Sequence, residues 1–528
     1  MKNKNIFIVS FLIFSMILAS CTKQVTNETQ TTWEIQTTIE TTTNNEVKLN
    51  SSWSKEIELT LTNNSSEKIT LNWNLISYSW NNASINWNKI TINKAWNYEI
   101  SWTLNNWQII VDTTDNSAVH LILNWVTITN STSSTIYVKN WKQTIITLAD
   151  GSINTLTDGN KYTFEDENEE PNATIFSKDN LIIMWNWNLK VNANYNDWIA
   201  SKDTLVIKSW NIEIISVDDG IRWKDLLQID GWNIKITSAW DSIKSDNEEK
   251  WEIIINAWDI EISSWDDAVH AEVSLTINWW NINITKSYEW FESKTITING
   301  WNINIVSSDD GINVAWWNDS SWMWWNWWWD FKWMNSLENS NYYLYINGWK
   351  IYVNASWDWL DSNGSIIMTA WEVYVNGPTW NGNGALDYDK DFKISGWVII
   401  AAWSSWMAQN ISSASTQNWV LIWFDSSVSA WVKFEIKDNS WNIITTFTPI
   451  KNYQSIVVSN SSLKTWETYT YYLWWEKKWD FTISSISSKV WNTSNWMWGG
   501  MWLWRWERWT PPEWFWDWQT RPNPPNME

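Results

Sequence analysis

Short runs of alternating apolar and polar residues dominate the chain after its first fifty residues. Thr295–Asn299 reads TITIN and Asn302–Ile305 reads NINI, with Gly300 and Trp301 between the two runs. Alternation with a period of two is the pattern of a β-strand that is buried on one face. No helical pattern of useful length follows residue 21. The sequence therefore predicts an all-β fold.

An acidic anchor, usually followed by a small and then an aliphatic residue, recurs at a period near 22 residues. Successive spacings are 22, 22, 26, 22, 21 and 48 residues, for anchors at Asp197, Asp219, Asp241, Asp267, Glu289, Asp310 and Asp358. Alternating runs fill each interval. A sustained period of this length with short strands is typical of a solenoid. We therefore predict a parallel β-helix over residues 48–409, with one coil of about 22 residues per repeat.

The pattern changes toward the C-terminus. Between residues 410 and 486 the repeat is lost and the alternating runs lengthen, as in Trp431–Lys437, which predicts a small β cap or an appended β domain. Residues 487–528 are rich in Ser, Trp, Gly and Pro, and we expect them to be disordered. A Trp-, Gly- and Asn-rich insertion at 316–335 accounts for the longest spacing between anchors.

The first 21 residues have the pattern of a bacterial lipoprotein signal peptide. Lys2 and Lys4 precede an apolar run at Ile6–Leu18, and Leu18-Ala19-Ser20-Cys21 matches a lipobox. Cys21 is the one cysteine of the chain, so we expect it to be lipidated rather than catalytic. Residues 22–47 are polar and predict a flexible tether. The expected location is the cell surface, with membrane contact through the N-terminal lipid only.

Tryptophan and glycine occur in unusual proportions. The chain has 59 Trp and 14 Gly, and Met323–Phe331 reads MWWNWWWDF. Exposed indole at this density is not typical of a soluble surface, whereas the same stretches with glycine at the Trp positions are ordinary flexible segments. We therefore expect most of these positions to be glycine in the natural protein, through UGA codons read as Trp. A chain that is truly rich in Trp is the alternative.

The overall charge excludes one class of partner. There are 36 basic and 58 acidic residues, a formal net charge of −22, which argues against nucleic acid because a phosphate-binding protein needs a positive face. One cysteine excludes a disulfide framework and a Cys-rich metal cluster, and two histidines argue against a His-based zinc site.

The acidic anchors are candidates for a calcium site. Neighbouring coils of a β-helix lie about 4.8 Å apart, and carboxylates stacked at that spacing repel one another unless a cation or proton intervenes. Calcium prefers several oxygen ligands. The candidate metal ligands are Asp197, Asp218, Asp219, Asp241, Asp266, Asp267, Asp309 and Asp310. The alternative is that each Asp caps its own turn.

Basic and aromatic residues on the outward face are candidates for carbohydrate binding. Arg222, Lys224, Lys244 and His270 follow the acidic anchors, and Arg or Lys is the natural partner of a sugar carboxylate. Solvated charges that balance the nearby Asp residues are the alternative. Tyr352 and Tyr374 occupy equivalent outward positions in two coils, where they would form either a sugar platform or a cross-strand pair.

Several of these stretches resemble a known family. They include Val119–Trp125, Leu148–Asn154, Asp218–Asp225 and Asn381–Tyr388. The resemblance, which covers roughly residues 75–475, is to secreted bacterial carbohydrate-binding proteins whose ligands include polygalacturonate and cellulose. It implies a right-handed parallel β-helix, bound calcium, an acidic polysaccharide as ligand and an architecture like that of pectate lyases. It favours binding over turnover, and a polysaccharide lyase or a surface adhesin is the alternative.

Overall fold

The computed structural model describes most of the chain between residues 46 and 491. Longer segments outside this description are 1–45, 315–341 and 492–528, and the shorter ones are 50–56, 61–65, 73–74, 78–81, 141, 165–169, 185–187, 246–251, 279–280, 301, 309, 349, 357–358, 370–371, 381–383, 397, 406–408 and 410. Cys21, Asp309 and the insertion at 316–335 fall in these segments and stay sequence predictions.

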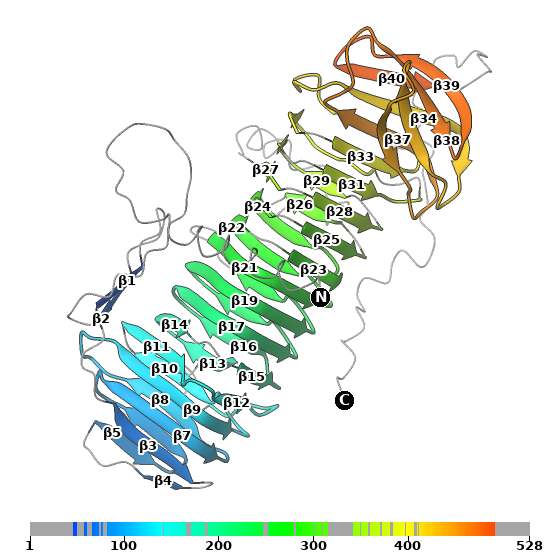
Figure 1. Ribbon diagram of the computed structural model, residues 1–528. Helices are drawn as coiled ribbons and strands as arrows, with labels where there is room; N and C mark the ends of the chain where they lie inside the picture. The colour runs from blue at the N-terminus through cyan, green and yellow to red at the C-terminus, as the bar shows by residue number, and fades with distance from the viewer. Residues whose placement is uncertain are drawn as a thin grey trace, which may run out of the picture. The chain divides into compact units, whose positions relative to one another are not determined.

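The described residues form strands and no helix, and the strands wind into a parallel β-solenoid of about ten turns (Figure 1). This confirms the prediction of an all-β fold built on a parallel β-helix. Each coil adds one strand to each of three parallel ladders, which we name A, B and C in the order in which the chain passes through them after an acidic anchor.

Ladder A comprises β6 (Lys89–Ile92), β8 (Gln108–Asp112), β10 (Ile136–Asn140), β13 (Ala173–Ser177), β16 (Asp197–Ser201), β18 (Ile221–Trp223), β20 (Ile243–Ser245), the start of β22 (Val269–Ile277), the start of β24 (Phe291–Ile298), β26 (Ile312–Val314) and β29 (Leu360–Ser362).

Ladder B comprises β3 (Glu67–Asn72), β7 (Asn97–Leu104), β9 (Val119–Thr129), β11 (Gln143–Leu148), β14 (Asn180–Met184), β17 (Leu205–Ser216), β19 (Leu226–Ser238), β21 (Glu252–Ser263), the ends of β22 and β24, β27 (Tyr343–Ile346), β30 (Ser365–Met368) and β32 (Phe392–Ile394). Ladder C comprises the ends of β7, β9, β17, β19 and β21 together with β12 (Ile153–Thr157), β15 (Asn188–Ala193), β23 (Asn281–Lys286), β25 (Asn302–Ser307), β28 (Lys350–Ala355), β31 (Glu372–Asn376) and β33 (Val398–Trp403).

Aliphatic side chains fill the interior of the solenoid in columns. In ladder A the pairing Ile199, Ile221, Ile243 stacks one buried side chain over the next at successive coils. Because strand side chains alternate between faces, the residues next to these isoleucines along each strand point outward. The core therefore holds the acidic anchors and the outward side chains of successive coils in register.

Additional strands flank the solenoid. β4 (Leu75–Ser77) and β5 (Ala83–Asn86) pair antiparallel with β3 and β6 near its first coils. β1 (Glu46–Leu49) and β2 (Ile57–Thr60) form an antiparallel pair in a separate compact unit.

The region after the last coil contains antiparallel strands, as Figure 1 shows at the C-terminal end of the solenoid. β37 (Tyr453–Asn460) pairs antiparallel with both β33 and β34 (Trp419–Val428), and β40 (Ser487–Trp491) pairs parallel with β34. A second sheet has the order β36 (Ile443–Phe447), β35 (Phe434–Asp438), β38 (Thr468–Leu473) and β39 (Glu476–Thr482). β40 lies within the segment that the sequence assigned to the tail.

Tryptophan occupies backbone conformations that favour glycine. Among the described residues, eight that are not glycine have a positive φ, and seven of them are Trp: Trp87, Trp102, Trp125, Trp431, Trp441, Trp466 and Trp474. Other tryptophans are fully buried, and the indole Nε1 of Trp198, Trp290 and Trp359 lacks a hydrogen-bond partner within the described chain. These three align with Gly220 and Gly311, where an added Cβ would lie 2.4 and 2.7 Å from a carbonyl oxygen of the next coil.

Candidate functional site

The acidic anchors form a buried column at the start of ladder A, which we call the turn column: Asp197, Asp219, Asp241 and Asp267. Oδ1 of Asp219 accepts a hydrogen bond from the amide of Asp241 at 3.2 Å, and Oδ1 of Asp241 accepts one from the amide of Asp267 at 2.8 Å. Oδ1 of Asp267 likewise accepts from the amide of Glu289 at 3.1 Å. Three of the four carboxylates therefore tie one coil to the next, which is a structural role.

Three of the anchors also have a cationic partner three residues further along the same coil. Nζ of Lys244 lies 2.7 Å from Oδ2 of Asp241, an Nη atom of Arg222 lies 3.9 Å from Oδ2 of Asp219, and Nδ1 of His270 lies 3.5 Å from Oδ2 of Asp267. The equivalent residue after Asp197 is Ala200, which brings no charge. The turn column is thus compensated by its own coils everywhere except at Asp197.

Asp197 lies at the least compensated point of the column. One oxygen each of Asp197, Asp218 and Asp219 lie within 4.8 Å of one another. Asn172 donates to Oδ2 of Asp197 at 3.0 Å, but Oδ1 is buried without a hydrogen-bond partner among the described residues. Burial, then the charges of Asp219 and Asp218, raise the pKa of Asp197 well above its usual range, and Arg222 and the backbone amide of Asp219 oppose the rise only in part.

The second group of predicted metal ligands is Asp241, Asp266 and Asp267, whose oxygens also lie within 4.8 Å of one another. Lys244 already neutralises Asp241 at hydrogen-bond distance, and the imidazole of His270 faces Asp267. Asp310 is half-buried at its own turn, outside both groups. The structure therefore brings the predicted ligands together in two groups, of which the Asp197 group has the unsatisfied oxygen.

A groove of about 340 Å³ lies on ladder A, and its lining includes Asn172, which donates to Asp197, and Ala200, three residues after Asp197. Its lining includes the cationic side chains of Lys202, Arg222 and Lys224 and the carboxylate of Glu170, which forms an ion pair with Lys202. Arg222 is half-buried and Lys224 is exposed. Two of the four basic residues predicted from the sequence thus line one groove.

Lys244 and His270 are placed differently from that pair. Lys244 reaches Asp241. Burial disfavours the charged form of Lys244, but the carboxylates of Asp241 and Asp219 stabilise it more strongly, so the pKa of Lys244 lies above its usual value. Burial also opposes the charged form of His270, but Glu292, Asp267 and Glu272 outweigh it and hold the pKa of the imidazole well above its usual range. Both side chains are therefore engaged with carboxylates of this chain.

The predicted aromatic residues do not join the basic groove. Tyr352 and Tyr374 pair in register on ladder C and are half-buried against the core of the C-terminal sheets. The ring of Tyr374 stacks on Phe447, with centroids 5.7 Å apart, and the hydroxyl of Tyr352 accepts a hydrogen bond from Asn376 at 2.9 Å. This packing is the cross-strand alternative rather than a sugar platform.

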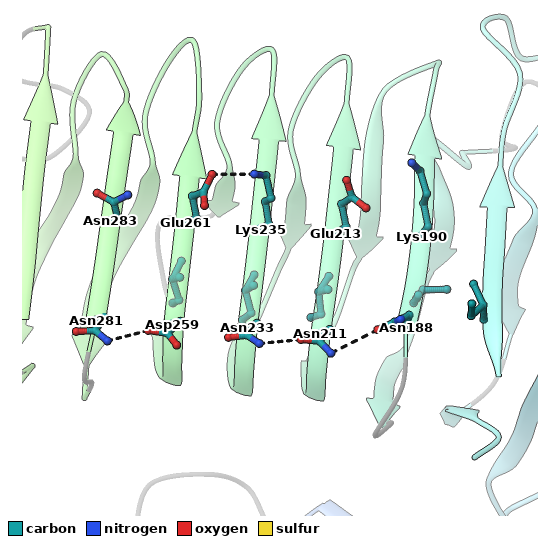
Figure 2. Close-up of a pocket in the computed structure, with 15 residues that line it drawn as sticks. Asn188, Lys190, Asn211, Glu213, Asn233, Lys235, Asp259, Glu261, Asn281 and Asn283 are labelled. Carbon is teal, nitrogen blue, oxygen red and sulfur yellow. Dashed lines mark hydrogen bonds and ion pairs between the residues drawn. The ribbon is translucent and has the colours of Figure 1, made fainter. Parts of the chain in front are cut away.

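A second groove, on ladder C, was not predicted from the sequence. It has a volume of about 820 Å³ and runs across ladder C over five coils (Figure 2). One row of its side chains is Asn188, Asn211, Asn233, Asp259 and Asn281, and the next row is Lys190, Glu213, Lys235, Glu261 and Asn283. The mixed charges of the second row gave no signal of a binding surface in the sequence.

The asparagine row is interrupted at one place. The amide of Asn233 donates to Asn211 at 2.8 Å, and the amide of Asn281 donates to Asp259 at 2.8 Å. Asn233 and Asp259 are register partners in adjacent coils. A carboxylate has no hydrogen to donate, so Asp259 cannot continue the ladder to Asn233, and two acceptors face each other (Figure 2).

The pKa shifts in the turn column predict how stability depends on pH. Burial, followed by the charge of Asp241, raises the pKa of Asp219 to about 7, whereas an unfolded Asp titrates near 3.9. The folded state binds more protons between these values, so its stability is fully present below about pH 4 and falls as pH rises through 7. In chelator, the melting temperature should fall over this range. Calcium should remove the fall if it binds the Asp197 group, and thermal unfolding from pH 4 to 8 checks both.

A family comparison and a curated relative carry the same description. Residues 86–316 match a family described as carbohydrate-binding domain-containing protein. A curated protein of that description from Acetivibrio thermocellus is 43% identical over 124 residues, which are 23% of this chain and 43% of the relative, so the chain spans less than half of that relative.

Among solved structures, a polysaccharide lyase-like protein from C. thermocellum, studied as a gadolinium derivative, aligns with a TM-score of 0.41 and 32% identity, over 46% of this chain and 97% of that one. The family match at 86–316 includes the whole turn column and both grooves. The coils that carry these features are thus similar in sequence to the carbohydrate-binding domain family.

Proposed function

We propose that this protein binds an acidic polysaccharide, such as polygalacturonate, at the ladder A groove with the help of a calcium ion. The observation that carries the proposal is the buried, unpartnered Oδ1 of Asp197 beside Asp218 and Asp219. Three oxygens within 4.8 Å of one another suit an ion that lies about 2.4 Å from each of its ligands.

One set of residues would bind the calcium ion, and a second set would bind the sugar. Asp197, Asp218 and Asp219 would hold calcium, which supplies positive charge and open coordination positions for carboxylate oxygens of the ligand. Arg222 and Lys224 line the adjacent groove, where a guanidinium and an ammonium would bind further sugar carboxylates. A chain with a net charge of −22 needs such a local positive region to hold a polyanion.

Binding to polygalacturonate tests this proposal. Isothermal titration of residues 48–491 should show binding in calcium that chelator abolishes. Arg222→Gln should weaken affinity by about 10- to 150-fold, since a charge-assisted hydrogen bond contributes about 1.5–3 kcal/mol. Lys489→Gln, which removes an exposed cation from β40, is the matched control. Equal affinity with calcium and with chelator would contradict the calcium role, and no affinity in either would contradict the acidic ligand.

The ladder C groove is a second candidate surface for carbohydrate. The facing acceptors of Asn233 and Asp259 would receive hydroxyl hydrogens of a sugar. Asp259→Asn should close the ladder, because its new amide can donate to Asn233, and should leave stability equal or higher by up to about 1 kcal/mol. Affinity for an uncharged glucan should fall, while Asp425→Asn, an exposed residue of β34, should change neither. Unchanged glucan affinity in the Asp259 variant would remove this surface from consideration.

The N-terminal signal and the alternative functions can each be tested separately. A lipoprotein signal at 1–21 would place the domain at the cell surface. A polysaccharide lyase would increase ultraviolet absorbance as unsaturated products form. A surface adhesin would bind its partner through the region 410–486. Within the part of the chain that the structure covers, no helix has both the length and the apolarity of a membrane span.

A further inference from the structure

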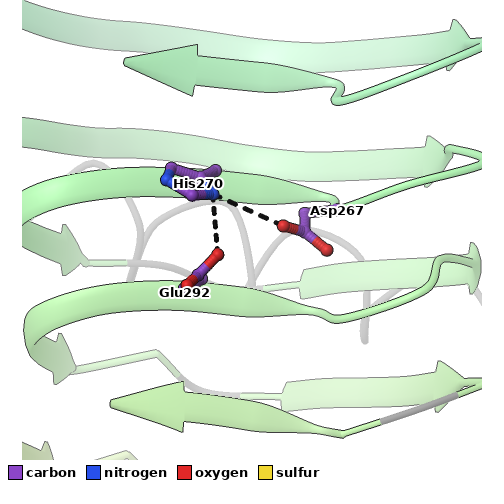
Figure 3. Close-up of side chains that lie close together, drawn as sticks. All are labelled: Asp267, His270 and Glu292. Carbon is purple, nitrogen blue, oxygen red and sulfur yellow. Dashed lines mark hydrogen bonds and ion pairs between the residues drawn. The ribbon is translucent and has the colours of Figure 1, made fainter. Parts of the chain in front are cut away.

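We propose that Asp267, His270 and Glu292 form a binding site for a divalent transition-metal ion such as Zn²⁺ or Co²⁺, separate from the calcium site at Asp197. The three side chains come from the turn before β22, from β22 and from β24, in two adjacent coils (Figure 3). His270 and Glu292 are register partners, so the ladder itself holds the imidazole over the carboxylate.

The donor set fits a transition metal better than calcium. Nδ1 of His270 lies 2.7 Å from Oε2 of Glu292 and 3.5 Å from Oδ2 of Asp267, and the three donor atoms lie within 4.8 Å of one another. Zinc takes imidazole nitrogen and carboxylate oxygen at about 2.0–2.2 Å in tetrahedral geometry, which separates neighbouring donors by roughly 3.4 Å. The Asp267 separation already matches, and the Glu292 side chain would withdraw by less than 1 Å.

The other ring nitrogen has the partner that a metal-binding histidine usually has. Nε2 of His270 lies 3.6 Å from Oε1 of Glu272, which is itself buried. The contact is longer than a hydrogen bond, but a carboxylate that closed onto the far nitrogen would fix the tautomer that leaves the near nitrogen free to bind a metal. Glu272 is thus a positioning residue, not a ligand, because it faces the opposite side of the ring.

The charge of the site also favours a divalent cation. Three carboxylates surround one imidazole, so even a protonated ring leaves two negative charges among residues that are largely buried. Lys244 is the nearest cation of the preceding coil, but its Nζ is 2.7 Å from Asp241. A dication bound to the neutral ring would reduce the excess to one negative charge.

His270 differs from its neighbours in the same column. Arg222 and Lys244 occupy the equivalent positions of the two preceding coils and pair with the anchors of those coils. A guanidinium or an ammonium group only donates hydrogen bonds and has no lone pair to offer a metal ion. Among the three described cationic partners of the turn column, His270 alone has a ring nitrogen that can exchange its proton for a metal ion.

This comparison supplies a variant that should fold. His270→Lys restores the residue of the preceding coil, whose ion pair with Asp241 shows that the site geometry accepts lysine. Wild-type protein freed of metal should bind one Co²⁺ at this site, with visible d–d absorption, and His270→Lys should lose that absorption. Glu272→Gln keeps all three ligands and should weaken Co²⁺ binding by about 10- to 100-fold.

Two outcomes would overturn the proposal: wild-type protein without the Co²⁺ absorption, or the same absorption and affinity in His270→Lys. Near-ultraviolet circular dichroism checks that each variant is folded. Asp197→Asn should leave Co²⁺ binding intact, and His270→Lys should leave calcium-dependent polygalacturonate binding intact, so the two sites can fail independently.

Discussion

Glycine at the seven tryptophan positions with positive φ is expected to raise the free energy of unfolding, by roughly 1–2 kcal/mol per position. The left-handed region brings Cβ too close to the following carbonyl oxygen, and glycine lacks Cβ. All seven side chains are more than half exposed, from 51% at Trp474 to 90% at Trp87. Removal of these side chains therefore loses little packing. Urea unfolding of the tryptophan chain and of the glycine chain measures the difference in the free energy of unfolding.

Alanine at the same seven positions is the control. It removes the indole but keeps Cβ, so the alanine chain should gain much less stability than the glycine chain. If the two variants were equally stable, the backbone explanation would fail and the indoles themselves would be the burden. The codons offer an independent check, because UGA at these positions would agree with glycine in the natural protein and UGG would contradict it.

Loss of Lys244 is expected to be the most damaging charge substitution in the turn column. Asp241 is 1% exposed, and its Oδ2 accepts a hydrogen bond from Lys244 at 2.7 Å. Lys244→Met would leave a buried carboxylate without compensation, which costs about 3 kcal/mol or more in buried pairs. Chemical denaturation should show a lower midpoint with an unchanged slope.

A double variant tests whether the loss comes from the unpaired carboxylate of Asp241 or from removal of the Lys244 side chain itself. Asp241→Asn combined with Lys244→Met should recover much of the loss, because no unpaired charge remains. Lys235→Met, which breaks an exposed pair with Glu261 on ladder C, should have little effect since such pairs are solvated. A loss in Lys235→Met as large as that in Lys244→Met would show that burial of the carboxylate is not the cause.

The repeat made most of the fold predictable. Alternation with a period of two placed the strands, and the anchor spacing placed the coils, because each physical repeat is written into the chain as a local pattern. The turn column followed from the same spacing. Even the exception at Asp197 is visible in the sequence, since Ala200 stands where Arg222 and Lys244 stand in later coils.

Contacts between distant segments were not predictable in this way. Tyr374 packs on Phe447, more than seventy residues further along the chain. No local sequence pattern predicts that the C-terminal sheets cover this part of ladder C. The break between Asn233 and Asp259 depends on pairing across a coil of irregular length, 26 rather than 22 residues. The cluster at His270 likewise combines Glu292 from the next coil with Glu272 from its own strand.

The hydrogen bonds that join successive anchors have a consequence for how this scaffold can change over evolutionary time. The carboxylates of Asp219, Asp241 and Asp267 each accept a hydrogen bond from the backbone of the next anchor, and a backbone amide is the same group in every residue except proline. Duplication or loss of one whole coil would therefore recreate the same bond at the new junction. The length of the surface can grow or shrink by gene duplication within the repeat, while the chemistry of each coil diverges by single substitutions at positions such as Ala200, Arg222 and His270.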